Sequence, residues 1–474
     1  MELDKDLQAR QEARRLAALA ERAQAELAKM SQQQLDRIVE AVAEAFSKAS
    51  TELASMAVRE TGFGNVEDKT VKNEFASKTV LSAIGDMKTV GVLKEHPGEK
   101  LWEVGVPVGV IAAIVPSTNP TSTVCYKAMI ALKAGNSIVF SPHPKAILCT
   151  LRAAEIVAQA AENAGAPKGC VSCLGIASMA GCEELMHASQ VRLILATGGP
   201  GMVRAAYSSG KPAIGVGAGN GPAYIHHSAD VRKALGCILR SKSFDNGTVC
   251  ASEQSIIVEK DMEQQVRETA SAMGFYFMNT QEAGSLAKLL FRPTGALNPE
   301  IVGRSALELA KKAGFSVPAG TKILVAREQE AGPTRPYSME KLCPVLAFFV
   351  MDSEDAVLTK AIEVLTHEGS GHTFAMHAKE ESVVRKFALQ IPVSRFLVNT
   401  PAALGGIGAT TGLFPALTLG CGAVGGSSSS NNISPLDLIN IRRVAWDREE
   451  KPQREEYDEG LVEILTAKIL ERLK

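Results

Sequence analysis

The 474-residue chain has no excess of charge of either sign and no long apolar run. Lys and Arg number 51 against 52 Asp and Glu, a net charge of −1 that argues against nucleic acid or a membrane as partner. No apolar run reaches the roughly 18 residues of a membrane-spanning helix, and residues 1–30 lack the apolar segment of a signal peptide. Nine cysteines in so long a chain indicate no disulfide scaffold. We therefore expect a soluble, cytoplasmic protein with reduced thiols.

The N-terminal part is rich in helix-forming residues. Ala, Leu and Arg dominate residues 7–30, and Ser31 with Gln34 has the pattern of a capping box that opens a second helix. We expect the first hundred residues to be helical. Apolar residues that recur at three- and four-residue spacing predict a face of the second helix that packs on the core: Leu35, Ile38, Val39, Val42 and Phe46.

After residue 107, short runs of branched apolar residues alternate with helix-like segments. This alternation predicts an α/β protein with parallel sheets. The first series of predicted strands is 108–116, 137–140, 171–174 and 191–196. A second α/β unit is expected to begin near residue 226, with predicted strands at 254–258, 344–351, 372–377 and 395–399. The Gly- and Ser-rich residues 405–435 predict loops, and the charged residues 447–459 predict a linker.

The densest group of chemically active side chains surrounds Cys250, in Phe-Asp-Asn-Gly-Thr-Val-Cys-Ala-Ser-Glu-Gln over residues 244–254. A cysteine in a loop beside a strand can be an exposed, rigidly held nucleophile, but a small buried apolar side chain is the more common role. Glycine-rich stretches at 196–201, 215–221 and 405–408 do not fit the dinucleotide fingerprint and could be tight turns. The first of them lies between a predicted strand and a helix, where backbone N–H groups can bind a pyrophosphate.

Three other patterns carry less weight. Cys170 and Cys173 have metal-like spacing but lack a second Cys or His pair. The sequon at Asn246 has no meaning in a protein without a signal peptide. His226 and His227 have no acidic neighbour in the sequence, so we expect no metal site.

Nine segments, taken together and in order, resemble the CoA-acylating branch of the aldehyde dehydrogenase superfamily, in particular acetaldehyde and propionaldehyde dehydrogenases of the bacterial microcompartment type. The segments are residues 115–122, 140–144, 196–202, 215–220, 244–254, 340–345, 369–373, 399–401 and 417–422. The resemblance implies the fold of that family: two Rossmann-like α/β domains and a small β-flap that builds homodimers or tetramers. We expect N-terminal helices and an NAD-binding domain over residues 1–225, and a catalytic domain over residues 226–415. Residues 416–446 would return to the cofactor domain and form the oligomerisation segment, and residues 447–474 a linker and a helix.

The resemblance also implies roles for individual residues. Cys250 would attack the aldehyde, Asn119 would hold the oxyanion, and His372 would assist the CoA thiol, although a structural role for His372 stays open. Glu340 matches the carboxylate that binds the nicotinamide ribose. The other residues implied in NAD binding are Ser141, His143, Thr197, Gly198, Gly199 and Gly217. No residue is expected to bind a metal.

Hydrolytic relatives carry a glutamate that activates water in the stretch matching residues 215–220, and this chain has none there. The resemblance therefore favours transfer of the acyl group to CoA: aldehyde, CoA and NAD would give acyl-CoA and NADH. A hydrolytic aldehyde dehydrogenase and a non-redox cysteine acyltransferase are the alternatives. Because no cationic cluster is evident for an acidic substrate, we expect a short aliphatic aldehyde such as acetaldehyde or propanal.

The C-terminal residues Leu461–Lys474 predict a helix with Val462, Leu465, Ile469 and Leu473 on one face. A helix of about fourteen residues is marginal alone in water, so this face needs a partner. It could dock on its own subunit. Alternatively, the resemblance to microcompartment enzymes implies that it binds a shell protein and directs the enzyme into the compartment.

Overall fold

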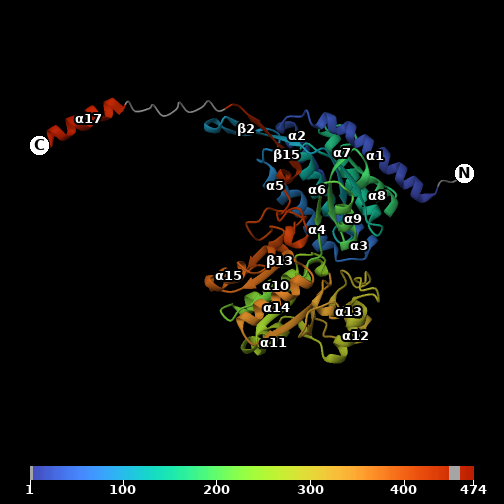
Figure 1. Ribbon diagram of the computed structural model, residues 1–474. Coiled ribbons are helices and arrows are strands. Elements are labelled where there is room, and N and C mark those ends of the chain that lie inside the picture. The colour runs from blue at the N-terminus through green and yellow to red at the C-terminus, as the bar shows by residue number, and fades with distance from the viewer. Residues whose placement is uncertain (1–3, 448–458, 474) are drawn as a thin grey trace.

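The computed structural model describes residues 4–447 and 459–473, which form three β-sheets covered by helices (Figure 1). A five-stranded sheet has the order β5-β4-β3-β6-β7, and a seven-stranded sheet the order β10-β11-β12-β9-β8-β13-β14. Both are parallel throughout, whereas the three-stranded sheet β1-β2-β15 is antiparallel. The expected α/β class with two parallel sheets is confirmed.

Four strands of the five-stranded sheet match the first predicted series, and the fifth, β7, was not predicted. They are buried apolar runs, as expected when helices cover both faces of a parallel sheet. The strands are β3 (Val110–Ile114), β4 (Ser137–Ser141), β5 (Val171–Cys173), β6 (Val191–Thr197) and β7 (Ala213–Val216). The helices between them are α6 (Pro120–Lys133), α7 (Ile147–Asn163), α8 (Met179–His187) and α9 (Pro200–Ser208).

The N-terminal helices pack around this sheet. Ser31 and Gln34 form the predicted capping box, and the predicted apolar face is buried. The helices are α1 (Lys5–Leu27), α2 (Gln32–Lys48), α3 (Ser50–Thr61), α4 (Val66–Glu74) and α5 (Val80–Ile84), with a π-helical turn, η1 (Phe75–Thr79), between the last two. The prediction that the first hundred residues are helical is wrong from Gly91. There β1 (Gly91–His96) and β2 (Leu101–Pro107) form a hairpin whose residues are mostly half-buried and lack the continuous buried apolar run of the parallel strands.

The seven-stranded sheet contains all four strands of the second predicted series. Its strands are β8 (Gly221–Ile225), β9 (Glu253–Glu259), β10 (Phe275–Phe277), β11 (Ile323–Arg327), β12 (Val345–Met351), β13 (Gly371–His377) and β14 (Val393–Val398). Its helices are α10 (Val231–Ser243), α11 (Glu263–Ala272), α12 (Thr280–Leu290), α13 (Ala306–Ala313), α14 (Glu354–His367), α15 (Glu381–Ala388) and α16 (Ala402–Gly406). The chain enters this sheet at Gly221, whereas the expected second unit begins near residue 226.

Two segments present apolar side chains to solvent. In the three-stranded sheet, β15 (Ile439–Ala445) pairs with β2, and the rings of Trp102 and Trp446 meet edge to face at 4.9 Å. The C-terminal helix α17 (Glu459–Arg472) begins close to the predicted helix, and all its described side chains are exposed. The expected linker at 447–459 lies almost wholly outside the described residues. Within the described residues, no helix has the length and apolar character needed to cross a membrane.

Candidate active site

A cavity of about 230 Å³ lies between the carboxyl edge of the five-stranded sheet and the loop that precedes β9. It collects segments that are far apart in the sequence. Eight of the ten predicted site residues line it, namely Asn119, His143, Thr197, Gly198, Gly199, Gly217, Cys250 and Glu340. The cavity therefore brings the candidate nucleophile, the candidate oxyanion donor and the candidate cofactor residues to one place.

Cys250 lies in the loop between α10 and β9, and this loop is held in an unusual conformation. Asp245, Asn246 and Gly247 all have positive φ, at 48°, 51° and 74°. For the two residues with side chains this backbone is strained, and such strain is typical of functional loops. A Cβ on Gly219 would lie 2.0 Å from the carbonyl oxygen of Cys250. A glycine at this position is therefore required for the loop after β7 to approach the cysteine.

The thiol of Cys250 is protonated at neutral pH in this state of the protein. Burial, and then the negative charge of Glu340, raise the pKa of Cys250 to about 12. Burial, and then Glu368, raise the pKa of Glu340 to about 8, and Glu340 Oε1 accepts a hydrogen bond from Gly219 N at 2.8 Å. Attack by Cys250 therefore requires removal of its proton or a positive charge bound nearby.

Asn119 caps α6, and its side chain is fixed by a lysine that the sequence did not point to. Lys72 Nζ, on α4, donates to Asn119 Oδ1 at 2.6 Å, and Lys72 itself lines the cavity. Asn119 Nδ2 lies 3.2 Å from Thr118 Oγ1 and 3.5 Å from the Thr248 carbonyl oxygen. The amide group is therefore held with its oxygen toward Lys72.

The predicted phosphate-side residues form a strand–turn–helix unit. Thr197 ends β6, Gly199 caps α9, and Pro200 is the first residue of that helix. The first N–H groups of a helix are free to bind an anion, and Thr197 Oγ1 is buried without a hydrogen-bond partner. No atom lies within 4 Å of a Cβ placed on Gly199 or Gly217. A pyrophosphate with its ribose fits this open, donor-rich turn.

Two predicted residues do not line the cavity. Ser141 ends β4 and interacts with the Cys182 thiol. His372 begins β13 with no exposed surface, and its Nδ1 pairs with Thr373 Oγ1 at 2.8 Å. Burial, and then the charge of Arg395, lower the pKa of His372 to about 3, and its Nε2 has no hydrogen-bond partner. The imidazole is therefore neutral at any working pH.

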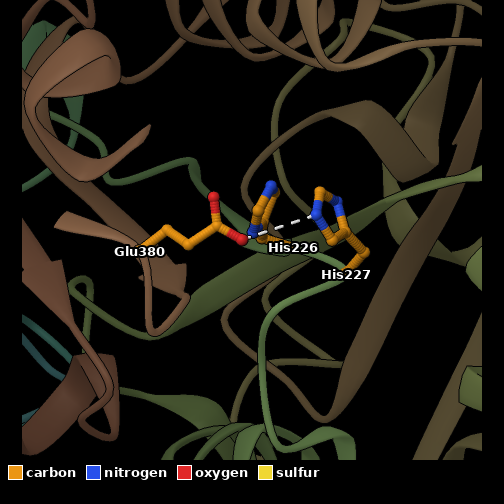
Figure 2. Close-up of side chains that lie close together, drawn as sticks. All are labelled: His226, His227 and Glu380. Atoms are coloured by element: carbon orange, nitrogen blue, oxygen red, sulfur yellow. Dashed lines mark ion pairs between the residues drawn. The ribbon is translucent and has the colours of Figure 1, made fainter. Parts of the chain in front are cut away.

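His226 and His227 have acidic neighbours in space that the local sequence does not reveal. Glu380 Oε1 lies 3.6 Å from His227 Nε2 (Figure 2). Glu354 Oε2 lies 3.5 Å from His226 Nε2. The ligand atoms of His226, His227 and Glu380 lie within 4.8 Å of one another. Ligands of tetrahedral zinc lie roughly 3.4 Å apart, given bonds of about 2.0–2.1 Å, and the 3.6 Å between Glu380 Oε1 and His227 Nε2 is close to that spacing.

Comparison with known proteins identifies the family. The model of the aldehyde dehydrogenase family matches residues 6–274. The chain is 46% identical over 439 residues to the bifunctional aldehyde-alcohol dehydrogenase AdhE of Escherichia coli K12, covering 91% of this chain and 49% of that protein. The chain thus spans about half the length of this curated relative.

Solved structures agree. An acetylating aldehyde dehydrogenase from Geobacillus thermoglucosidasius superposes with a TM-score of 0.93 at 48% identity, covering 95% of this chain and 100% of the other. A propionaldehyde dehydrogenase from the fucose utilisation bacterial microcompartment of Clostridium phytofermentans gives 0.83 at 27% identity, covering 92% and 98%. Because the family match extends over more than half of the chain, the protein belongs to the aldehyde dehydrogenase family.

Proposed function

We propose that the protein oxidises a short aliphatic aldehyde with NAD⁺ and transfers the acyl group to CoA. The balanced reaction is RCHO + CoA-SH + NAD⁺ → RCO-S-CoA + NADH + H⁺. The observation that carries this proposal is the carboxylate content of the cavity. Among the described residues that line it, only Glu340 bears a carboxylate, and the loop at 215–220 brings none to Cys250. Glu340 is assigned to the nicotinamide ribose, which leaves no carboxylate of the cavity to activate water, so a thioester on Cys250 persists until a thiol attacks it.

Different residues of the cavity act in different steps of the proposed reaction. The Cys250 thiol loses its proton to solvent, Sγ bonds to the aldehyde carbon as the C=O π bond opens, and Asn119 Nδ2 donates to the oxygen that becomes negative in the thiohemiacetal. Bound NAD⁺ supplies the acceptor for the hydride that leaves this intermediate. The product on the protein is a thioester of Cys250, and attack by the CoA thiol releases it.

The turn between β6 and α9 would hold the cofactor. Thr197 Oγ1 and the N–H groups of Gly198 and Gly199 suit the pyrophosphate, and His143, which lines the cavity, would face the adenosine. Burial, and then Lys145, lower the pKa of His143, so it is neutral. Glu340 would receive the ribose hydroxyls beside Cys250. Ser141, at the end of β4, would support the adenosine side of the cofactor site.

His372 is proposed to assist acyl transfer to CoA. Its support is chemical rather than positional: the buried imidazole is neutral, and Nε2 has no hydrogen-bond partner in the described structure. Because a pKa of about 3 makes the imidazole a weak base, this role requires that bound CoA raise the pKa of His372. His372→Ala is expected to slow acyl transfer more than the first burst of NADH. Equal loss in both half-reactions would show that His372 serves only the fold.

The cavity suits a small, uncharged substrate. Apolar side chains cover much of its wall, and the single lining ammonium group, Lys72, already donates three hydrogen bonds. Among the described residues that line the cavity, a carboxylate or sulfonate on the substrate would therefore find no free ammonium group. The apolar lining residues are Val216, Val249, Leu342, Ile407, Leu417 and Leu419. Acetaldehyde and propanal are the proposed substrates.

We propose that the three-stranded sheet forms a homo-oligomer, dimer or tetramer. Trp102, Ile441 and Trp446 are 38%, 44% and 47% exposed on it, an unusual apolar surface for a free flap. Ile441→Asp should shift the molecular mass measured by light scattering toward that of one chain. An unchanged mass would place the contact elsewhere.

We propose that α17 directs the enzyme into a bacterial microcompartment by binding a shell protein. Six large apolar residues of the helix are exposed, and the first and last of them, Leu461 and Leu470, are 56% and 58% exposed. Ile464 and Leu470 extend the apolar surface beyond the expected face, so the helix is less sharply two-sided than predicted. Residues 448–474 fused to a fluorescent protein should form foci in cells that build shells. Diffuse fluorescence would refute this role.

The nucleophile is tested by Cys250→Ala, which should abolish NADH formation and leave NAD binding intact. The matched control is Cys237→Ala, because Cys237 is another half-buried cysteine, on α10, and does not line the cavity. Activity of the Cys250 variant above a trace would overturn the proposed function.

A further inference from the structure

Three buried charged side chains lie directly behind the proposed oxyanion site. Asp245 has no exposed side-chain surface, and Lys69 and Lys72 are 3% and 4% exposed. Asp245 Oδ2 accepts hydrogen bonds from Lys69 Nζ at 2.8 Å, Lys72 Nζ at 2.6 Å and Thr248 Oγ1 at 2.6 Å. Burying ions costs free energy, so such a cluster is weak evidence for stability and invites a functional reason.

The two lysines have different partners besides Asp245. Lys69 donates to the Thr118 carbonyl oxygen at 2.8 Å. Lys72 donates to Asn119 Oδ1 at 2.6 Å and to Thr248 Oγ1 at 2.9 Å. The three hydrogens of its ammonium group are thus all used, and one of them goes to the side chain of the proposed oxyanion donor.

An ammonium group can only donate, and this fixes the direction of the Asn119 amide. Oxygen is the one atom of that amide that can accept from Lys72, so Nδ2 must lie on the opposite side. Without Lys72, the amide could turn and present its oxygen to the developing oxyanion, which would repel it. The positive charge on Lys72 also polarises the amide and strengthens Nδ2 as a donor.

The same cluster holds the nucleophile loop. Thr248 is two residues before Cys250, and Asp245 opens the turn of positive-φ residues that carries it. Gly64 packs so tightly on Asp245 that a Cβ there would lie 1.7 Å from Oδ1. Lys72, on α4, therefore joins Asn119 from one sheet to the cysteine loop of the other.

We propose that Lys72 is a positioning residue of the reaction: it orients the Asn119 amide so that Nδ2 faces the carbonyl oxygen bound at Cys250. This proposal rests on the proposed function, because it acts through Asn119. Burial lowers the pKa of Lys72 to about 8 against the raising effect of Asp245, and Lys69 and Asp68 are the other charges that act on it. At pH 7 most of the lysine is charged.

A double-mutant cycle tests the proposal. The measured quantity is the rate of the first NADH burst at saturating NAD⁺ and aldehyde, which reports the step in which the oxyanion forms. Lys72→Met should slow the burst roughly 10- to 100-fold, toward the loss expected for one oxyanion donor. In a chain that already carries Asn119→Ala, Lys72→Met should change the burst less than about threefold, because no amide remains to be oriented.

Lys69→Met is the matched control. It removes an equal charge from the same carboxylate without contacting Asn119, so it should lower the unfolding midpoint comparably yet keep most of the burst rate. Lys72→Gln, which is uncharged but keeps a donor, should fall between Lys72→Met and the parent. It also preserves the test should Lys72→Met fold poorly.

The outcomes separate the two proposals. If Lys72→Met slows the NADH burst by the same factor in the parent and in the Asn119→Ala chain, the positioning role is overturned and the proposed function stays intact. If the burst is as slow in Lys69→Met as in Lys72→Met, the cluster acts only through stability, and the positioning role of Lys72 is overturned. If Asn119→Ala leaves the burst unchanged, the oxyanion role of Asn119 fails, and the role of Lys72 fails with it.

Discussion

Replacement of Asp245 by asparagine should cost far more stability than the loss of a single surface ion pair. The carboxylate is fully buried and neutralises two buried lysines, Lys69 and Lys72. Asparagine keeps the size of the side chain but leaves both ammonium groups without a negative partner. Removing one partner of a buried ion pair destabilises a protein by roughly 3–5 kcal/mol, because the remaining charge is uncompensated.

The sign of the pH dependence follows from the same contacts. Burial by itself would raise the pKa of Asp245, but the charges of Lys72 and Lys69 outweigh it and hold the pKa below its usual value. The stabilisation by the ionised carboxylate is therefore complete above the unfolded pKa of about 3.9 and is lost as the pH falls through the folded value. The unfolding free energies of the parent and of Asp245→Asn should therefore be compared at pH 7, where the stabilisation by the ionised carboxylate is complete.

Equilibrium unfolding in urea, followed by circular dichroism, is the assay. The control is Glu74→Gln, which breaks the exposed pair with Lys78, where the two side chains are 44% and 60% exposed. An exposed pair at this spacing contributes about 0.3–0.5 kcal/mol. If Asp245→Asn destabilises no more than Glu74→Gln, the buried cluster does not hold the cysteine loop as described.

Three further results are expected. Asn119→Ala should lower turnover by roughly 10²–10³, the usual loss for one oxyanion donor, and an unchanged NADH burst would exclude it from that role. Inactivation by iodoacetamide should accelerate about tenfold per pH unit between pH 7 and 10, because the pKa of Cys250 is about 12, and a plateau near neutral pH would contradict that pKa. Gly219→Ala should remove nearly all activity, since its Cβ would meet the Cys250 carbonyl oxygen at 2.0 Å, and retained activity would show that the two loops are not so closely packed.

Much of the fold could be read from the sequence because buried parallel strands are continuous apolar runs. Residues 137–140 and 344–351 are examples, and both form strands of the sheets. The hairpin over residues 91–107 could not be read, because its pairing partner β15 begins more than 300 residues later and its strands lack a continuous buried apolar run. Its stability depends on that distant pairing rather than on a local pattern.

The site shows the same division between local and distant information. The segment around Cys250 and the glycine turn at 197–199 are local, and the cavity contains both. Lys72 carries no local signal, because a lysine on a polar helix is usually exposed, and only the packing of α4 against the cysteine loop buries it. The acidic neighbours of His227 could not be predicted for a related reason, since Glu259 and Glu380 come from other elements around the seven-stranded sheet.

The direct test of the proposed function is the dependence of NADH formation on CoA, measured for acetaldehyde and propanal with product analysis. With CoA, the account predicts sustained turnover with one acyl-CoA for each NADH. Without CoA, it predicts a burst of at most one NADH per Cys250, followed by slow release. Full-rate NADH formation without CoA, with the free carboxylic acid as the product, would contradict it.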